Sequence, residues 1–265
     1  MTAQSQLVAA AILRQDDAGI CTLTLNRPAA RNALSRGLMA ALQDELERIA
    51  KDRSVRVVVI AAAGPGFCAG HDLKEIRSDP RRETYEALFA QCSLLMRSIV
   101  HLPQPVIARV HGIATAAGCQ LVATCDLAVA GASAKFATPG VNIGLFCSTP
   151  MVALSRNVAP KHAMEMLLTG DMIDAASAAR IGLVNRVVAD AELDAAVTAL
   201  ATQIASKSTA TVKIGKEAFY RQREMPLTDA YDYASRVMTE NMMKNDAAEG
   251  IDAFIQKRPP TWSDQ

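Results

Sequence analysis

The sequence predicts an α/β protein in which a parallel sheet is followed by a long helical segment. Up to about residue 130, short apolar runs alternate with segments whose apolar residues recur every three or four positions, as strands and helices do. Beyond Pro150 the helical pattern covers almost the whole chain, and only residues 183–188 resemble a strand. We therefore expect an α/β core in residues 1–200 and a helical C-terminal region in residues 201–265.

The first elements follow from local signals. Residues 7–14 and 20–25 are β-rich runs on either side of a turn-rich Asp-Asp-Ala-Gly, which predicts a hairpin. Ser35 is a suitable N-cap for a helix that continues to about Ala50. Its apolar stripe consists of Leu38, Met39, Leu42, Leu46 and Ile49.

Residues 55–63 form a nearly continuous apolar run, as expected of a strand that is covered on both faces. This strand leads into a glycine-rich loop at residues 64–70. The same reasoning predicts a helix over 84–101, strands over 106–110 and 127–130, a helix over the small residues 114–125, and a helical stripe over 193–204.

Composition excludes several classes of function. The 28 Lys and Arg residues nearly balance the 27 Asp and Glu residues, so we expect no nucleic-acid partner. Residues 1–19 lack a cationic segment followed by an apolar one, and no apolar run is long enough for a bilayer, which predicts a cytoplasmic protein without a membrane partner. The six cysteines and four histidines show no metal-ligand spacing, so we expect no metal.

Two junctions between a strand and a helix have the composition of an oxyanion site. At residues 64–75 and again at 111–120, small residues lead directly into a helix start, where backbone N–H groups are free. Two such helix starts that converge on one oxygen would stabilise an enolate or a tetrahedral oxyanion. A nicotinamide site is not expected, because the third glycine of 64–70 comes one residue late and no βαβ unit opens the chain.

At these residues the chain resembles the crotonase superfamily, also called the enoyl-CoA hydratase/isomerase family. The resemblance spans nearly the whole chain, with its motifs in the family's order. They are Asn-Arg-Pro at 26–28, Asn-Ala-Leu at 32–34, Phe-Cys-Ala-Gly-His-Asp-Leu at 67–73, Ala-Ala-Gly-Cys-Gln at 116–120, Cys-Asp at 125–126, Phe-Ala-Thr-Pro at 136–139 and Phe-Ile-Gln-Lys-Arg at 254–258.

The resemblance implies a crotonase fold of repeated ββα units, with C-terminal helices that help to build a homotrimer or a dimer of trimers. It implies an acyl-CoA substrate, with coenzyme A as part of that substrate and no separate cofactor. The family's two oxyanion donors correspond to the backbone N–H groups of His71 and Ala117. Contacts with coenzyme A are implied at Ala29, Arg31, Ala69, Asp72, Leu73, Gly118, Gly140 and Lys257, although Lys257 also fits a solvated basic chain end.

The family's two catalytic glutamates are both replaced. They correspond to Gln120, whose amide exchanges no proton at neutral pH, and to Gly140, which has no side chain. We expect an acyl-CoA lyase, hydratase or isomerase with weak or absent simple hydratase activity. A decarboxylase or other lyase, and a non-catalytic acyl-CoA-binding protein, remain as alternatives.

Four side chains near these motifs each have two interpretations. Gln120 either orients a water molecule or a substrate carbonyl, or only bonds to neighbouring backbone. Cys119 and Cys147 are either nucleophiles or, as free cysteines usually are, small buried apolar residues. The ring of His71 either donates a proton, or only the backbone of this residue acts.

Overall fold

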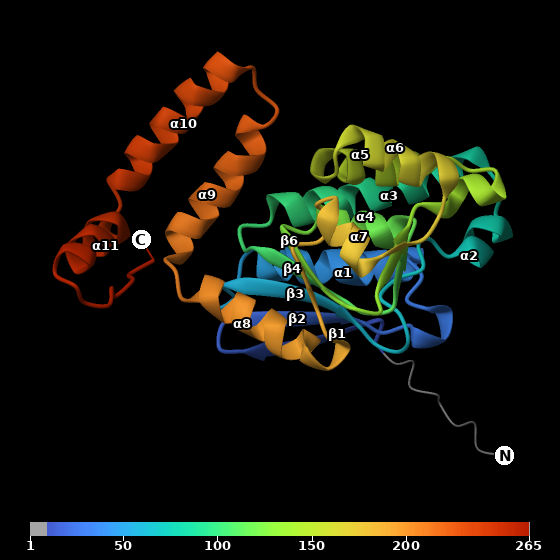
Figure 1. The fold of residues 1–265 in the computed structure, drawn as a ribbon, viewed down its shortest axis with the longest axis horizontal. Coiled ribbons are helices and arrows are strands. Elements are labelled where there is room, and N and C mark those ends of the chain that lie inside the picture. Colours follow the sequence, from blue (N-terminus) through green and yellow to red (C-terminus); the bar gives the residue numbers. More distant parts are fainter. Residues whose placement is uncertain (1–9, 265) are drawn as a thin grey trace.

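The protein is described by a computed structural model, which covers residues 10–264. Its main sheet has six strands in the order β1-β2-β3-β4-β6-β9, all parallel except for β1, which pairs antiparallel with β2 (Figure 1). These strands are β1 (Ile12–Asp17), β2 (Ile20–Leu25), β3 (Val57–Ala62), β4 (Val106–Val110), β6 (Leu127–Gly131) and β9 (Arg186–Val188). A second sheet joins β5 (Ile113–Thr115), β7 (Lys135–Ala137) and β8 (Ile173–Asp174).

Helices cover both faces of the main sheet. One face packs into the large core that contains α1 (Arg36–Ile49), α3 (Arg82–His101) and α4 (Ala117–Thr124). On the other face, α8 (Leu193–Ala205) packs against β3, β4 and β6. The remaining helices are α2 (Leu73–Ser78), α5 (Ser148–Asn157), α6 (Pro160–Thr169), α7 (Ala175–Arg180), α9 (Thr209–Gln222), α10 (Leu227–Met242) and α11 (Asn245–Ile255), with short 3-10 turns η1 (Pro28–Ala30), η2 (Pro139–Ile143) and η3 (Asp190–Glu192).

Most predicted elements are confirmed in place. The Oγ of Ser35 accepts the N–H of Leu38 at 3.2 Å and caps α1, and every residue of β3 is buried, as a strand covered on both faces requires. The hairpin forms as β1 and β2, although the predicted start at residues 7–9 lies outside the described residues.

Two boundaries differ from the prediction. Residues 113–115 form β5 and not the start of a helix, because their backbone pairs with β7 and with Cys68, and because Ile113 and Thr115 are β-branched residues that favour a strand. The predicted core limit at residue 200 falls inside α8, which covers the sheet, so the helical extension begins only after Ala205.

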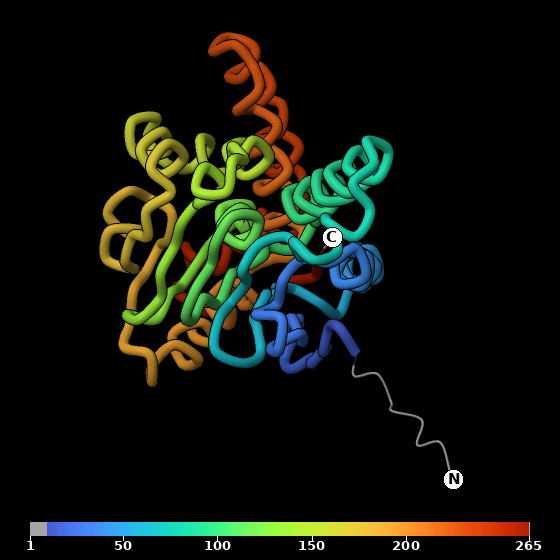
Figure 2. Tube along the Cα trace, turned by 90° about the vertical axis from the view of Figure 1, so that its right-hand side faces the viewer, coloured from blue at the N-terminus to red at the C-terminus, as the bar shows by residue number. Residues whose placement is uncertain are grey.

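The C-terminal helices α9 and α10 form an antiparallel pair that projects beyond the core (Figures 1 and 2), and α11 lies beside the start of α9, at the end of the pair opposite to the α9–α10 turn. The pair is fastened to the core by partly buried polar groups. Lys216 Nζ lies 2.6 Å from Asp126 Oδ2, and the Tyr220 hydroxyl donates to Asp126 Oδ1 at 2.8 Å. Asp126 also accepts the N–H of Val106 at 2.7 Å, so one carboxylate joins α9 to the start of β4.

Candidate active site

The glycine-rich loop after β3 is held in place by the buried side chain of Asn32. Its Nδ2 donates to the carbonyl oxygens of Ala63 at 2.8 Å and Gly66 at 2.9 Å. Its Oδ1 accepts the N–H of Arg27 at 2.8 Å. A fully buried amide satisfied in this way fixes the backbone around it. Asn32, to which the sequence assigned no role, is therefore a scaffold for the loop.

The N–H of His71 points away from Leu34, which lies in the segment before α1. The N–H of Leu34 donates to the carbonyl oxygen of Gly70 at 2.7 Å. That carbonyl and the N–H of His71 belong to one trans peptide unit, so they point in opposite directions. The N–H of His71 therefore faces the other side, where α4 begins.

Ala116 turns the chain sharply before α4. Its φ of 50° and ψ of −118° are rare for a residue with a Cβ atom. Its carbonyl accepts the N–H of Gln120 at 3.0 Å, which starts the helix. The N–H of Ala117 lies at the other end of the same peptide unit and points out of the helix N-terminus. The unusual conformation of Ala116 thus determines the direction of the Ala117 N–H.

The two loops touch at glycines that leave no room for a side chain. A Cβ atom on Gly70, whose φ is +95°, would lie 2.9 Å from the Cβ of Ala116 and 3.4 Å from the nitrogen of Ala117. A Cβ atom on Gly118 would overlap the carbonyl oxygen of Cys68. Gly118 therefore has a packing role and faces the backbone of Cys68. We call residues 69–72 and 115–118 together the loop junction.

The N–H groups of His71 and Ala117 have no acceptor among residues 10–264. Ala117 is only 1% exposed, and a buried N–H without a partner is rare. The structure thus brings together the two residues that the sequence singled out as oxyanion donors. Two unused donors on adjacent rigid loops suit a substrate oxygen that gains negative charge.

The ring of His71 is mostly buried beside α3. Its Nδ1 lies 3.4 Å from the carbonyl oxygen of Leu34, and its edge contacts Phe89 with ring centroids 5.8 Å apart. Burial lowers the pKa of His71 from its ordinary value of 6.5, so the ring is neutral at neutral pH. The Nε2 atom is buried and has no partner in the described part of the chain. A neutral ring is poorly suited to protonate a substrate.

Asp72 is engaged by the protein itself. Its Oδ1 accepts the N–H groups of Lys74 and Glu75, and its Oδ2 lies 3.1 Å from the guanidinium of Arg27. Although partial burial raises the pKa of Asp72, the bonds to Arg27 and these N–H groups hold it below its usual range. The Arg27–Asp72 ion pair fixes the start of α2, a role that the Asn-Arg-Pro motif alone does not reveal.

The residues implied in coenzyme A binding fall into two places. Ala29 and Arg31 are exposed, and the carbonyl of Arg31 accepts the N–H of Ala69 at 3.1 Å, so this segment borders the loop junction. Leu73, at the start of α2, is 50% exposed. Lys257 follows α11, at the opposite end of the molecule from α2 (Figure 1), and a single chain does not bring it to the others.

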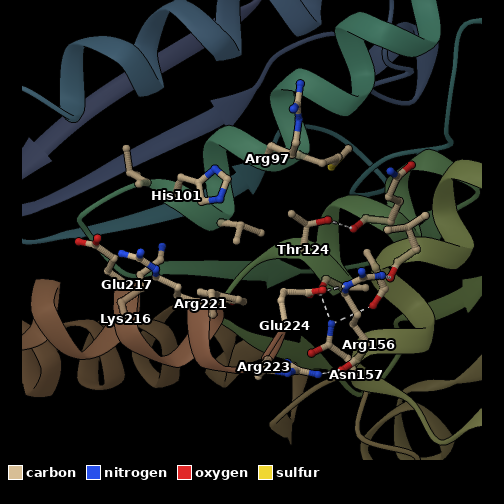
Figure 3. Close-up of a pocket in the computed structure, with 18 of the residues that line it drawn as sticks. Arg97, His101, Thr124, Arg156, Asn157, Lys216, Glu217, Arg221, Arg223 and Glu224 are labelled. Carbon is tan, nitrogen blue, oxygen red and sulfur yellow. Dashed lines mark hydrogen bonds and ion pairs between the residues drawn. The ribbon is translucent and has the colours of Figure 1, made fainter. Parts of the chain in front are cut away.

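Gln120 lies one helical turn after Ala117 and is 4% exposed. The only hydrogen-bond partner of its side-chain oxygen in the described chain is the Sγ of Cys92, at 3.9 Å. The residue lines a cavity of about 810 Å³ together with Ala123 and Thr124 (Figure 3). Its amide therefore has free hydrogen-bonding capacity near the loop junction.

The position of Gly140 is covered by the loop that follows it. A Cβ atom there would overlap the carbonyl oxygen of Leu145 and lie 2.9 Å from the Sγ of Cys147. Burial raises the pKa of Cys147, and it raises that of Cys119 to about 12, so both thiols are protonated at neutral pH. These thiols match small buried groups better than activated nucleophiles.

Comparison with known proteins identifies the family. A model of the family described as Enoyl-CoA hydratase/isomerase matches residues 15–265. The chain belongs to this family. It is 48% identical to the rat protein "Enoyl-CoA hydratase domain-containing protein 3, mitochondrial" over 250 residues, which are 94% of this chain and 83% of the rat protein.

Solved structures confirm the predicted crotonase fold of this family member. An enoyl-CoA hydratase from Mycobacterium smegmatis is 56% identical, with a TM-score of 0.94 over 96% of this chain and 99% of the other. Human enoyl-CoA hydratase domain-containing protein 3 is 45% identical, with a TM-score of 0.93 over 96% of this chain and all of the human one.

The expectation of a cytoplasmic protein is wrong. The rat relative and its vertebrate counterparts are named as mitochondrial proteins. The inference failed because the absence of one leader pattern says little about a compartment. Among the described residues, no helix is both long and apolar enough to cross a membrane, and no group of His, Cys, Asp and Glu side chains has the arrangement of a metal site.

Proposed function

We propose that this family member is an acyl-CoA enzyme that stabilises a thioester enolate with the backbone N–H groups of His71 and Ala117. The observation that carries the proposal is this pair of donors, held at one loop junction and without an acceptor among the residues that the structure describes. An enolate carries its charge mainly on the thioester oxygen, and donors fixed in advance lower its energy without reorganising. The family's description, Enoyl-CoA hydratase/isomerase, supports a coenzyme A thioester as the substrate.

Simple hydration of an enoyl thioester fits the site poorly. Water addition needs one group to accept a proton and another to donate one. Gln120 can do neither, and the space beside Gly140 is filled by Leu145 and Cys147. We therefore propose that hydration of crotonyl-CoA is slow or absent.

Decarboxylation is a second candidate that the missing acid–base pair favours. When a malonyl-type thioester loses CO₂, the carbon–carbon bond breaks and its electron pair forms the enolate, so no base is needed to start the reaction. The two N–H groups would stabilise that enolate, and a proton from water would then convert it to the saturated thioester. A lyase of this kind requires little beyond the loop junction.

The test is turnover of a thioester panel by the purified protein. We expect crotonyl-CoA hydration far below the ~1 to 10³ s⁻¹ of ordinary enzymes, and measurable turnover of at least one malonyl-type, isomerisable or longer enoyl thioester. Hydration of crotonyl-CoA at ordinary enzyme rates would overturn the proposal. Tight binding of thioesters without turnover of any would instead favour the non-catalytic acyl-CoA-binding protein.

We propose further that coenzyme A lies along the edge of the loop junction, against the exposed Ala29, Arg31 and Leu73 and the partly buried Ala69. Lys257 contributes only from a second copy of the chain, because α11 lies far from α2 within one chain (Figure 1). A homotrimer or dimer of trimers is supported by α10, which has no buried residue in the single chain. Its exposed apolar side chains include Leu227, Tyr231, Met238 and Met242. Light scattering after gel filtration tests this assembly.

A further inference from the structure

The ring of His111, just after β4, bonds to the loop that follows β3. Its Nε2 lies 2.8 Å from the carbonyl oxygen of Gly64, where the glycine-rich loop begins. The same loop leads directly to His71 and its N–H group. We propose that His111 is a positioning residue, which acts as a neutral ring and fixes the start of this loop so that the His71 N–H points at the substrate oxygen. The inference rests on the proposed function, because it assumes that the thioester oxygen lies at the loop junction.

The two partners of the His111 ring determine which of its nitrogens carries the proton. A carbonyl oxygen accepts hydrogen bonds and donates none, so Nε2 must donate to Gly64. On the other side of the ring, Nδ1 lies 3.1 Å from Nη1 of Arg109. A guanidinium donates hydrogen bonds and accepts none, so Nδ1 must accept. Both bonds therefore form together only in the neutral ring that carries its proton on Nε2.

Arg109 is itself held by the sheet and by the helix on its far face. Its backbone lies in β4 and pairs with Val129 of β6. Its Nε donates to the carboxylate of Asp194 on α8, and its side chain is only 21% exposed. The His111 ring is thus supported from the strand and from α8, and it extends that support to the start of the loop.

Three carbonyl groups at the start of the loop are bound by two side chains. Asn32 holds those of Ala63 and Gly66, on either side of the Gly64 carbonyl that His111 holds. Among residues 10–264, no other side chain and no backbone N–H donates to the Gly64 carbonyl. The direction of the peptide unit that follows Gly64 therefore depends on His111.

A shift of Gly64 would reach both parts of the proposed site. A Cβ atom on Gly64, whose φ is +80°, would overlap that of Pro28, so the two residues touch. Pro28 begins η1, which contains Ala29 of the proposed coenzyme A edge. Further along the loop, the N–H of Cys68 donates to the carbonyl oxygen of Ile113 in β5 at 3.0 Å. The loop is packed on both sides, so movement at its start is passed on to the coenzyme A edge and to the loop junction.

The experiment compares three variants of His111 in two measurements. Leucine fills the space of the ring without a donor, glutamine places an amide N–H where Nε2 lies, and asparagine is one carbon too short to reach Gly64. The first measurement is the infrared frequency of the thioester carbonyl in bound, ¹³C-labelled butanoyl-CoA, a saturated thioester that undergoes no addition. The second is kcat on the best substrate of the thioester panel.

We expect His111→Leu and His111→Asn to lose part of the frequency shift that the protein imposes on the bound carbonyl. Their kcat should fall about two- to tenfold, as the loss of one hydrogen bond would give. His111→Gln should keep the wild-type frequency and at least about half of the kcat, because its amide restores the bond. The frequency reports only on folded protein with thioester bound, so a merely structural role of the ring would leave it unchanged.

Nitrogen NMR of protein labelled with ¹⁵N-histidine tests the protonation of the ring without any substrate. At about pH 8, the resonances that disappear in His111→Gln should be those of a neutral ring with its proton on Nε2. A His111 ring with its proton on Nδ1 at that pH would overturn the inference.

The remaining outcomes separate the inference from the proposed function. If the wild-type carbonyl is shifted and neither His111→Leu nor His111→Asn reduces the shift, the inference fails and the proposed function stands. The same holds if His111→Gln loses as much of the shift as they do. If the shift depends on His111 but no thioester of the panel is turned over, the inference stands and the enzymatic proposal fails. If the wild-type carbonyl is not shifted at all, both fail.

Discussion

The loop junction and the two positions of the missing glutamates differ in what holds them. At the junction, Gly70 and Gly118 are packed so closely against the opposite loop that a Cβ atom would clash, and the useful groups are backbone N–H groups. At positions 120 and 140 the groups that transfer protons would be side-chain carboxylates. Position 120 instead has the amide of Gln120, and Gly140 has no side chain. Stabilisation of the enolate charge therefore depends on backbone N–H groups whose positions are fixed by many packing contacts. Proton transfer depends on two side chains, and a single substitution is enough to remove each of them.

The largest expected effect comes from removing one donor of the junction while keeping its shape. Replacement of Ala117 by lactic acid, through an unnatural α-hydroxy acid, turns its N–H into an ester oxygen and leaves the methyl group. Turnover of the best thioester substrate should fall about 100- to 1,000-fold, as the loss of an oxyanion donor does elsewhere. Steady-state kinetics on that substrate measure it.

Ala117→Gly is the matched control, because it removes the methyl group and keeps the N–H. We expect less than about a tenfold loss of turnover, since glycine costs the helix only about 1 kcal/mol. An ester variant as active as the control would remove Ala117 from the hole.

The packing of the junction is tested by Gly118→Ala. Its new Cβ atom would overlap the carbonyl oxygen of Cys68, so the loops must separate. We expect a loss of about 3 kcal/mol in the free energy of unfolding, at the upper end for overpacking. Urea denaturation measures it. For Gly215→Ala, on α9 with open space around it, the same measurement should give a gain of up to about 1 kcal/mol.

The other side of the comparison is tested by restoring the glutamates. Gln120→Glu should raise crotonyl-CoA hydration by at most about tenfold, because one positioned group alone supplies only part of the ~100- to 10,000-fold gain from proton transfer. Adding Gly140→Glu should give no further gain, since Leu145 and Cys147 occupy the space. Efficient hydration of crotonyl-CoA by the double variant would contradict this prediction, because it would show that Leu145 and Cys147 do not prevent a glutamate at position 140 from acting.

The smallest effect concerns the pH dependence of stability at His71. Burial lowers its pKa in the folded protein from 6.5, so just below that pH the unfolded chain binds a proton that the folded protein does not. The free energy of unfolding should therefore fall as the pH falls from 6.5 toward the folded pKa. His71→Phe should reduce this slope in urea titrations between pH 7 and 5, and an unchanged slope in this variant would contradict the assignment to His71.

Sequence and structure agree where local signals are strong. The Ser35 cap, the α1 stripe and the β3 run each gave a correct element, and the motifs located His71 and Ala117, which the fold places at one junction. The sequence analysis missed β5 because it gave more weight to the small residues of 114–125 than to the β-branched Ile113 and Thr115, which pair with β7. It also missed the loop over Gly140, because nothing local indicates that Leu145 and Cys147 fold back.

The most direct test of the account is the infrared frequency of the thioester carbonyl in a bound, ¹³C-labelled acyl-CoA. Two N–H donors aimed at this oxygen should move the stretch to lower wavenumber than in free thioester, and the lactic acid variant at Ala117 should reverse much of that shift. A bound carbonyl with the frequency of the free thioester, or an equal shift in the ester variant, would contradict the claim that the loop junction holds the substrate oxygen.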